Sequence, residues 1–149
     1  MISFATRNAE ETQALGRRLS QALKPGDVVS LTGPLGSGKT CLIQGLCQGL
    51  GVSAKVGSPS FVLVIEYEGK CPVQHIDLYR IQTSAELDGL GLEEACDPSA
   101  IALVEWGEKG EKHLIYSCRI SLDPEGESGR RIEVRFLNPE REGDLSDSL

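Results

Sequence analysis

The sequence lacks the segments by which a chain is exported or crosses a membrane. The N-terminal stretch MISFATRNAEE has neither a basic region nor an apolar core of the kind found in secretion signals. No window contains the long, uncharged apolar run that a membrane-spanning helix requires. We therefore expect a cytoplasmic protein that does not associate with a membrane.

Paired cysteine motifs and basic clusters are also missing. The five cysteines form no C-x-x-C pair, so neither a disulfide framework nor a zinc knuckle is expected. The lysines and arginines are scattered, and the formal net charge is −7. Because the phosphate backbone dominates nucleic-acid affinity, such a chain is not expected to bind nucleic acid tightly on its own.

The length of 149 residues fits one domain, which we place at residues 1–138. The remaining residues, 139–149, read PEREGDLSDSL and are mostly polar and acidic. Terminal segments of this composition are commonly frayed. We therefore predict a flexible tail there.

Strand-like and helix-like segments alternate in the first two thirds of the chain, and strand-like segments follow. Asn8 is the expected N-cap of the first helix, with Glu11 three residues later. Strands are expected at residues 2–6, 27–33, 61–69, 71–79, 100–106, 113–123 and 130–137, and helices at 8–23, 40–51 and 83–95. This order predicts an α/β sandwich whose sheet is mainly parallel in the middle, with antiparallel strands at its margin.

Residues 33–40 read GPLGSGKT, a complete match to the phosphate-binding pattern G-x-x-x-x-G-K-[ST]. The motif follows a predicted strand and opens a predicted helix, so backbone N–H groups and the helix N-terminus would face a phosphate. Lys39 would reach the β- and γ-phosphates, and the Thr40 hydroxyl would bind Mg²⁺. The alternative, a glycine-rich turn with an incidental lysine, is disfavoured by this context. The motif predicts a P-loop NTPase-like three-layer sandwich.

Two acids lie near the ends of predicted strands downstream of this motif. Glu105 ends the apolar run IALVE, and Asp77 ends VQHID. A nucleotide triphosphate and its Mg²⁺ need such an acid on a neighbouring strand. Each carboxylate could instead be solvated or paired with a lysine, but with the phosphate-binding motif upstream we favour a functional role for both.

Four other side chains near these acids have two open interpretations. His75 could act on a proton, although a lone histidine in a strand is more often hydrogen-bonded and structural. Arg80 could stabilise a transferred phosphate or pair with local carboxylates. Tyr79 and Trp106 could stack beside a nucleotide or simply pack against the end of the sheet.

Four motifs together resemble the TsaE (YjeE) family of small bacterial P-loop ATPases. They are GPLGSGKT, SPSF, HIDLYR and LVEWGEK, in this order, and the resemblance extends from about Thr6 to Phe136. The resemblance implies a cytosolic ATPase that uses ATP, ADP and Mg²⁺. It also implies a role in making threonylcarbamoyladenosine in tRNA, together with TsaD-like and TsaB-like partners. The ATPase would drive or reset that complex and meet tRNA only indirectly.

The resemblance also implies roles for individual residues. The phosphates would be cradled by Gly33, Leu35, Gly36, Ser37, Gly38, Lys39, Thr40 and Cys41. Mg²⁺ would be held by Thr40 and Glu105, with Asp77 as a second essential acid near the metal. Trp106 would lie beside the nucleotide, and Asn8, Thr12 and the turn at Gly129 and Arg130 would approach the base or ribose. Lys39, Asp77 and Glu105 would be the catalytic residues.

One departure from the family pattern is visible at residues 58–60, which read SPS where the family usually has S-P-T. Ser60 keeps a hydroxyl that could contact Mg²⁺ or the γ-phosphate, although its greater freedom could loosen the loop.

Two other functional classes remain open from the sequence. A small-molecule kinase would need a lid, usually rich in arginine, and no such segment is evident. A module that senses ATP or ADP without turnover would need only one acid for the metal, whereas this chain offers two. No guanine-reading N-K-x-D motif occurs, which weakly favours ATP.

Overall fold

A seven-stranded sheet forms the centre of the molecule, in a computed structural model that describes residues 1–57 and 64–148. Its strands are β1 (Ile2–Thr6), β2 (Val28–Thr32), β3 (Val64–Glu68), β4 (Pro72–Asp77), β5 (Ile101–Glu105), β6 (Cys118–Glu125) and β7 (Gly129–Phe136). Their spatial order is β1-β7-β6-β2-β5-β4-β3. The segment containing Ser60 lies outside the described residues, so its proposed contact stays a prediction.

The four inner strands, β6, β2, β5 and β4, run parallel to one another. The outer strands β7, β1 and β3 join antiparallel to their neighbours. This arrangement confirms the predicted α/β class with a parallel centre and antiparallel margins. It also brings the carboxyl ends of β2, β4 and β5 to one edge of the sheet.

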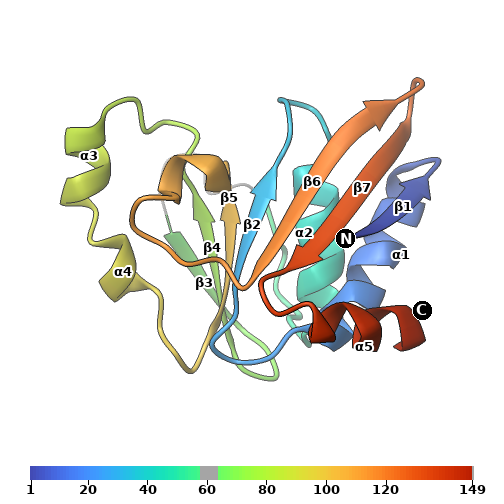
Figure 1. Cartoon of the computed structure of the whole chain (residues 1–149), viewed down its shortest axis with the longest axis horizontal. Helices are drawn as coiled ribbons and strands as arrows, with labels where there is room; N and C mark the ends of the chain where they lie inside the picture. Colours follow the sequence, from blue (N-terminus) through green and yellow to red (C-terminus); the bar gives the residue numbers. More distant parts are fainter. Residues whose placement is uncertain (58–63, 149) are drawn as a thin grey trace.

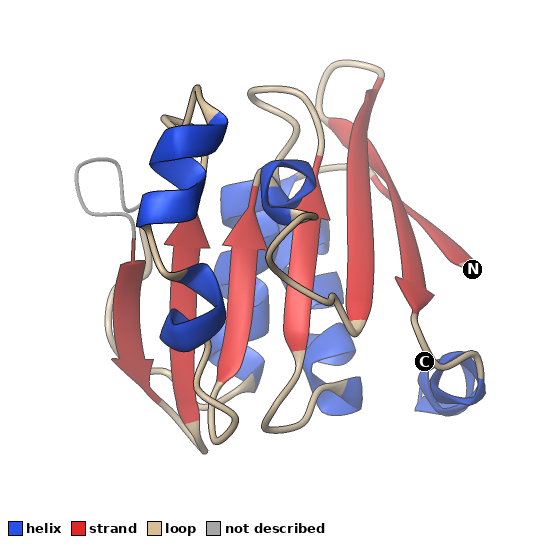
Figure 2. Cartoon of the chain, turned by 60° about the vertical axis from the view of Figure 1, so that its left-hand side comes forward, coloured by secondary structure: helices blue, strands red, loops and turns tan. Residues whose placement is uncertain are grey.

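Helices cover both faces of the sheet, which gives three layers (Figures 1 and 2). On one side lie α1 (Ala9–Leu19) and α2 (Lys39–Gly49), with the short 3₁₀ helix η1 (Ser20–Ala22) after α1. On the other side lie α3 (Ser84–Gly89), α4 (Leu92–Ala95) and the 3₁₀ helix η2 (Gly107–Gly110). The segment expected to be helical at residues 83–95 is divided into α3 and α4 around Gly89 and Gly91.

Strand β5 is buried along its whole length, as its apolar sequence predicts. Because side chains alternate between the faces of a strand, its odd and even positions enter different cores. Leu103 packs in the core that includes α1 and α2, whereas Val104 packs in the core under α3 and α4. Glu105 therefore emerges on the α2 side, at the end of the strand.

Helix α1 begins with the predicted cap, in which the Asn8 side chain accepts a hydrogen bond from Glu11 N at 2.9 Å. Glu11 in turn accepts from the backbone N–H of Arg7. The helix then packs closely on α2 through two glycines. A methyl group at Gly16 or Gly45 would collide with the backbone of the facing helix. This close approach fixes α2, and with it the loop that precedes it.

Residues Glu140–Ser148, which the sequence places in a predicted flexible tail, form helix α5. Arg141 donates two hydrogen bonds of 2.7 Å to the carboxylate of Asp27 and a third to the carbonyl of Ala22. Leu145 is fully buried in the main core. These contacts come from residues far apart in sequence, which explains why the acidic composition alone did not reveal them.

The structure also shortens the predicted strand at residues 113–123, which begins at Cys118 as β6. Leu114 N and His113 N both donate to the carbonyl of Gly110, so the chain is still turning there. Ile115 is 82% exposed.

Within the described residues, none of the helices has the length and apolar character needed to cross a membrane.

Candidate nucleotide site

The glycine-rich loop, residues 33–40, connects the end of β2 to the start of α2. Gly33 lies so close to β6 that a methyl group on it would collide with the carbonyl of Leu122. Gly36 and Gly38 have φ angles of 78° and 96°, which side chains rarely tolerate. The glycines of the motif are therefore required by the path of the backbone.

Helix α2 starts at this loop without a side-chain cap, because its N-cap residue is Gly38. Leu42 N donates to Gly38 O at 3.1 Å, which leaves the preceding N–H groups of the first turn outside the helical ladder. Such N–H groups, together with the helix dipole, favour an anion at this position.

The Lys39 ammonium lies folded against the loop. It donates to the carbonyls of Gly33 and Pro34 and lies 4.3 Å from the centre of the Trp106 ring. Burial lowers the pKa of Lys39 below its ordinary value, and the nearby carboxylates Glu105, Glu108 and Asp77 oppose this shift only in part. A bound anion would stabilise the charged form of this poorly solvated ammonium.

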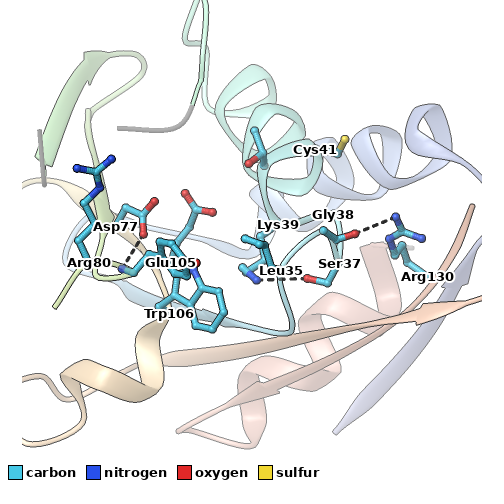
Figure 3. Close-up of a pocket in the computed structure, with 13 residues that line it drawn as sticks. Leu35, Ser37, Gly38, Lys39, Cys41, Asp77, Arg80, Glu105, Trp106 and Arg130 are labelled. Carbon is cyan, nitrogen blue, oxygen red and sulfur yellow. Dashed lines mark hydrogen bonds between the residues drawn. The ribbon is translucent and has the colours of Figure 1, made fainter. Parts of the chain in front are cut away.

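Asp77 and Glu105 lie opposite each other in the register of β4 and β5. Figure 3 shows their carboxylates close together, across the site from Lys39. Glu105 is only 4% exposed, whereas Asp77 is partly exposed and accepts a hydrogen bond from Tyr79 N at 2.9 Å. The two acids that the sequence singled out therefore meet at one edge of the sheet.

Behind these acids, His75 Nε2 lies 2.7 Å from Oε2 of Glu105. His75 is fully buried on β4, on the same face as Asp77. The sequence favoured a hydrogen-bonded structural histidine, and the structure identifies Glu105 as its partner.

Trp106 forms one wall of the site directly after β5. Its φ angle of 57° makes it the one non-glycine residue in the described part of the chain with a positive φ. Its ring packs against Tyr79, with centroids 5.1 Å apart. Lys109 holds the neighbouring turn by donating to the carbonyls of Tyr79 and Ile81, at 2.7 and 2.8 Å.

Arg130 forms the opposite side of the site, although it belongs to β7. It donates to Gly36 O at 3.2 Å, and its Nε atom lies against Gly38. Figure 3 shows the Arg130 side chain beside the glycine-rich loop. Strand β7, in the antiparallel margin formed with β1, thus supplies a guanidinium to the loop.

These residues enclose a cavity of about 510 Å³, large enough for a nucleotide-sized ligand. Its lining comes from the loop, the ends of β4 and β5 and the start of β7. The lining residues are Leu35, Gly36, Ser37, Gly38, Lys39, Thr40, Cys41, Asp77, Tyr79, Arg80, Glu105, Trp106 and Arg130.

Four of the expected site residues do not line this cavity. Gly33 lies behind it and offers its carbonyl to Lys39. Asn8 caps α1, and the buried Thr12 hydroxyl is 2.8 Å from that of Thr6. Gly129 starts β7 and packs against the backbone of the preceding hairpin. A contact of Asn8, Thr12 or Gly129 with the base or ribose stays a prediction.

Comparison with known proteins agrees with this geometry. The sequence pattern of one family, described as threonylcarbamoyl adenosine biosynthesis protein TsaE, matches residues 6–132. The chain belongs to the TsaE family. The family match covers the glycine-rich loop, both acids, Trp106 and Arg130.

Curated members of the TsaE family match most of the chain. A tRNA threonylcarbamoyladenosine biosynthesis protein TsaE from Treponema pallidum is 34% identical, covering 87% of this chain and 96% of its own. One from Nostoc sp. is 42% identical, covering 93% and 88%. The crystal structure of Bacillus subtilis YdiB superposes with a TM-score of 0.83 at 32% identity, covering 98% of this chain and 94% of that one.

Two contacts in this TsaE family member were not predicted as such. The sequence places His75 near the acids, but it does not show that the imidazole reaches Glu105. Arg130 was expected only as part of a turn near the base or ribose, whereas its side chain contacts the loop itself. The phosphate-binding motif and an arginine after a predicted turn are each visible in the sequence, but no local pattern pairs Arg130 with Gly36, because they are 94 positions apart.

Proposed function

We propose that the chain binds ATP with Mg²⁺ and hydrolyses it, in order to drive or reset a partner complex that makes threonylcarbamoyladenosine in tRNA. The observation that carries this proposal is the position of Lys39 across one cavity from the paired acids Asp77 and Glu105. A phosphate-binding loop alone would support binding, whereas an acid pair facing it supports hydrolysis.

The loop and its surroundings fit a polyphosphate. The N-terminus of α2 and the Lys39 ammonium would neutralise the β- and γ-phosphates. Arg130 is a further cation on the cavity wall. The Trp106 ring forms part of the same wall and would lie beside the nucleotide.

The chemistry of the oxygen donors fits Mg²⁺. The hydroxyl of Thr40 and the carboxylates of Asp77 and Glu105 all line the cavity. Mg²⁺ is usually held by one or two carboxylates plus phosphate oxygens and water. Among the described residues, no group of three or more His, Cys, Asp or Glu side chains is arranged to hold a metal ion as a dedicated cage would. When bound, the ion would polarise the phosphates and position water, while Thr40 and Glu105 hold it.

The family supports the biological setting. Its curated members are named for threonylcarbamoyladenosine biosynthesis in tRNA. With a formal net charge of −7, this chain would leave contact with the tRNA backbone to others. We propose that those partners are TsaD-like and TsaB-like proteins and that the complex acts in the cytoplasm.

The test is ATP turnover by the purified chain, alone and with the candidate TsaB–TsaD pair. We expect slow turnover alone, faster turnover with the pair, and none with Lys39→Ala. Lys112→Ala removes an exposed lysine outside the cavity and is the matched control. Turnover that is indifferent to the pair would contradict the partner-driven ATPase and would prompt a search for small phosphate acceptors.

A further inference from the structure

His75 contacts the site's buried acid from outside the cavity. The imidazole Nε2 and Glu105 Oε2 are 2.7 Å apart, and the two side chains are 0% and 6% exposed. Burying a carboxylate is costly unless hydrogen-bond donors satisfy it. The His75 ring meets this need at Oε2.

The register of the two strands explains how the contact forms. His75 lies opposite Leu103, one pleat before the position where Asp77 lies opposite Glu105. Both side chains emerge on the α2 face, so the Glu105 side chain reaches back along the sheet to meet the ring. The contact therefore fixes the rotamer of Glu105 as well as satisfying one of its oxygens.

The surroundings of Nδ1, on the other side of the ring, bear on which nitrogen carries the proton. Within residues 1–57 and 64–148, the buried Nδ1 atom has no hydrogen-bond partner. The Tyr67 ring is the aromatic neighbour, with centroids 6.4 Å apart. An unpaired acceptor is tolerated more readily in a protein interior than an unpaired N–H. This arrangement favours a proton on Nε2, which the ring donates to Glu105.

We infer that His75 is a positioning residue, which holds Oε2 of Glu105 by an Nε2–H hydrogen bond and leaves Oε1 directed into the cavity for the magnesium ion or its water. The inference rests on the proposed function, in which Glu105 acts on Mg²⁺ and ATP. His75 does not line the cavity, so it acts only through Glu105. Outer partners of metal-binding groups commonly have this effect, and their loss costs about 10–100-fold in affinity or activity.

A purely structural histidine makes a different prediction. Its removal would lower thermal stability but leave turnover by the remaining folded protein unchanged. Removal of a positioning residue would lower kcat with little change in ADP affinity. A replacement side chain that restores the N–H donor would restore kcat. The decisive comparison is therefore between a donor and an apolar replacement at the same buried position.

The experiment uses His75→Leu and His75→Gln in the full chain with its partners. We expect His75→Leu to lower kcat by about 10-fold or more and His75→Gln to stay within about 3-fold of wild type. In a Glu105→Gln background, His75→Leu should cause no further loss, because the two side chains act as a unit. Val73→Ala, which is buried on the same face of β4, is the control for a merely destabilised strand.

A second measurement does not depend on turnover. Calorimetry gives the ATP affinity with and without Mg²⁺, and the ratio of the two reports how well Glu105 supports the ion. We expect His75→Leu to reduce this ratio to the value for Glu105→Gln, while His75→Gln keeps the wild-type ratio. Should the wild type bind ATP·Mg²⁺ but never hydrolyse it, the hydrolytic part of the proposed function fails, whereas this ratio still decides the role of His75.

A third measurement examines the proton itself. The chain has two histidines, so the imidazole nitrogens of His75 and the partly exposed His113 can be distinguished by NMR in the ligand-free protein. We expect the Nε2–H tautomer at His75 and a change in its nitrogen shifts in Glu105→Gln. The inference is overturned if His75 carries its proton on Nδ1, or if folded His75→Leu keeps both the wild-type kcat and the wild-type magnesium ratio.

Discussion

Asp77 and Glu105 lie directly opposite each other on β4 and β5, and each is the last residue of its strand. Because these strands are parallel and adjacent, their carboxyl ends meet at the edge where the glycine-rich loop leaves β2. Their environments differ, since Glu105 is buried against His75 and Asp77 is partly exposed. The two acids are therefore suited to different roles at the same site.

Glu105→Gln should separate nucleotide binding from hydrolysis. We expect ADP affinity within about 3-fold of wild type, because Lys39 and the α2 N-terminus remain. ATP turnover should fall by about 100-fold or more, since the buried carboxylate is lost. Calorimetry and a phosphate-release assay measure the two effects, with the exposed Asp123→Asn as control. Unchanged turnover would contradict a catalytic role for Glu105, whereas lost turnover with undiminished function of the partner complex would favour a sensing module.

Trp106 should report ligand binding through its fluorescence. It is the single tryptophan of the chain, and the Lys39 ammonium lies 4.3 Å from its ring centre. A bound phosphate would draw this cation away, because phosphate is a stronger partner than an aromatic ring. We expect tryptophan emission to change on titration with ATP·Mg²⁺ and to respond much less in Lys39→Met. Emission that stays constant while calorimetry detects binding would contradict this account.

Most of the site could be predicted because its signals are local in sequence. The eight-residue motif at 33–40 specifies a strand, a tight loop and a helix together. The apolar run before Glu105 indicates a buried strand, and a buried strand that ends in an acid delivers that acid to the edge of the sheet. Short-range patterns of this kind also gave the class and layering of the fold.

The remaining features depend on contacts between distant segments. Arg130 reaches Gly36 across 94 positions, and Arg141 reaches Asp27 across 114. Neither pairing leaves a periodic or compositional signal in either segment. Helix α5 is held by two single residues, the cation Arg141 and the apolar Leu145. Because the rest of residues 139–149 is mostly polar and acidic, composition alone predicts a tail there.

The contact between α1 and α2 should be intolerant of added volume. A methyl group at Gly45 would meet the backbone of Gln13, which cannot move without displacing α1. We expect Gly45→Ala to lower the free energy of unfolding by about 1–3 kcal/mol, despite the better helix propensity of alanine. Gly143→Ala is the control, because it lies in α5 with open space around it and should stabilise by up to about 1 kcal/mol. Denaturant unfolding measures both changes, and equal behaviour of the two variants would contradict the close packing.

The pairing of Arg141 with Asp27 should make the stability of the fold depend on acid. Burial alone would raise the pKa of Asp27, but hydrogen bonds from Arg141 and the backbone of Lys24 outweigh it, so the pKa falls below its ordinary value of 3.8. A carboxylate with a lowered pKa in the folded state stabilises the protein at higher pH. That contribution is lost as pH falls below about 4 and through the folded-state pKa.

Arg141→Met should therefore be most harmful near neutral pH. It leaves the Asp27 carboxylate, which is 4% exposed, buried without its cation, and we expect a loss of about 3 kcal/mol in the free energy of unfolding at pH 7. The wild type loses the stabilisation from the Arg141–Asp27 pair in acid. The difference in free energy of unfolding between the two proteins should therefore narrow as pH falls from about 4 to 2. Urea unfolding at a series of pH values gives this difference directly. Arg131→Met, whose partner Glu133 is 3.6 Å away on the surface, is the control and should change stability by less than about 1 kcal/mol. A deficit that is independent of pH would show that Arg141 stabilises α5 by packing against Phe136 rather than through its charge.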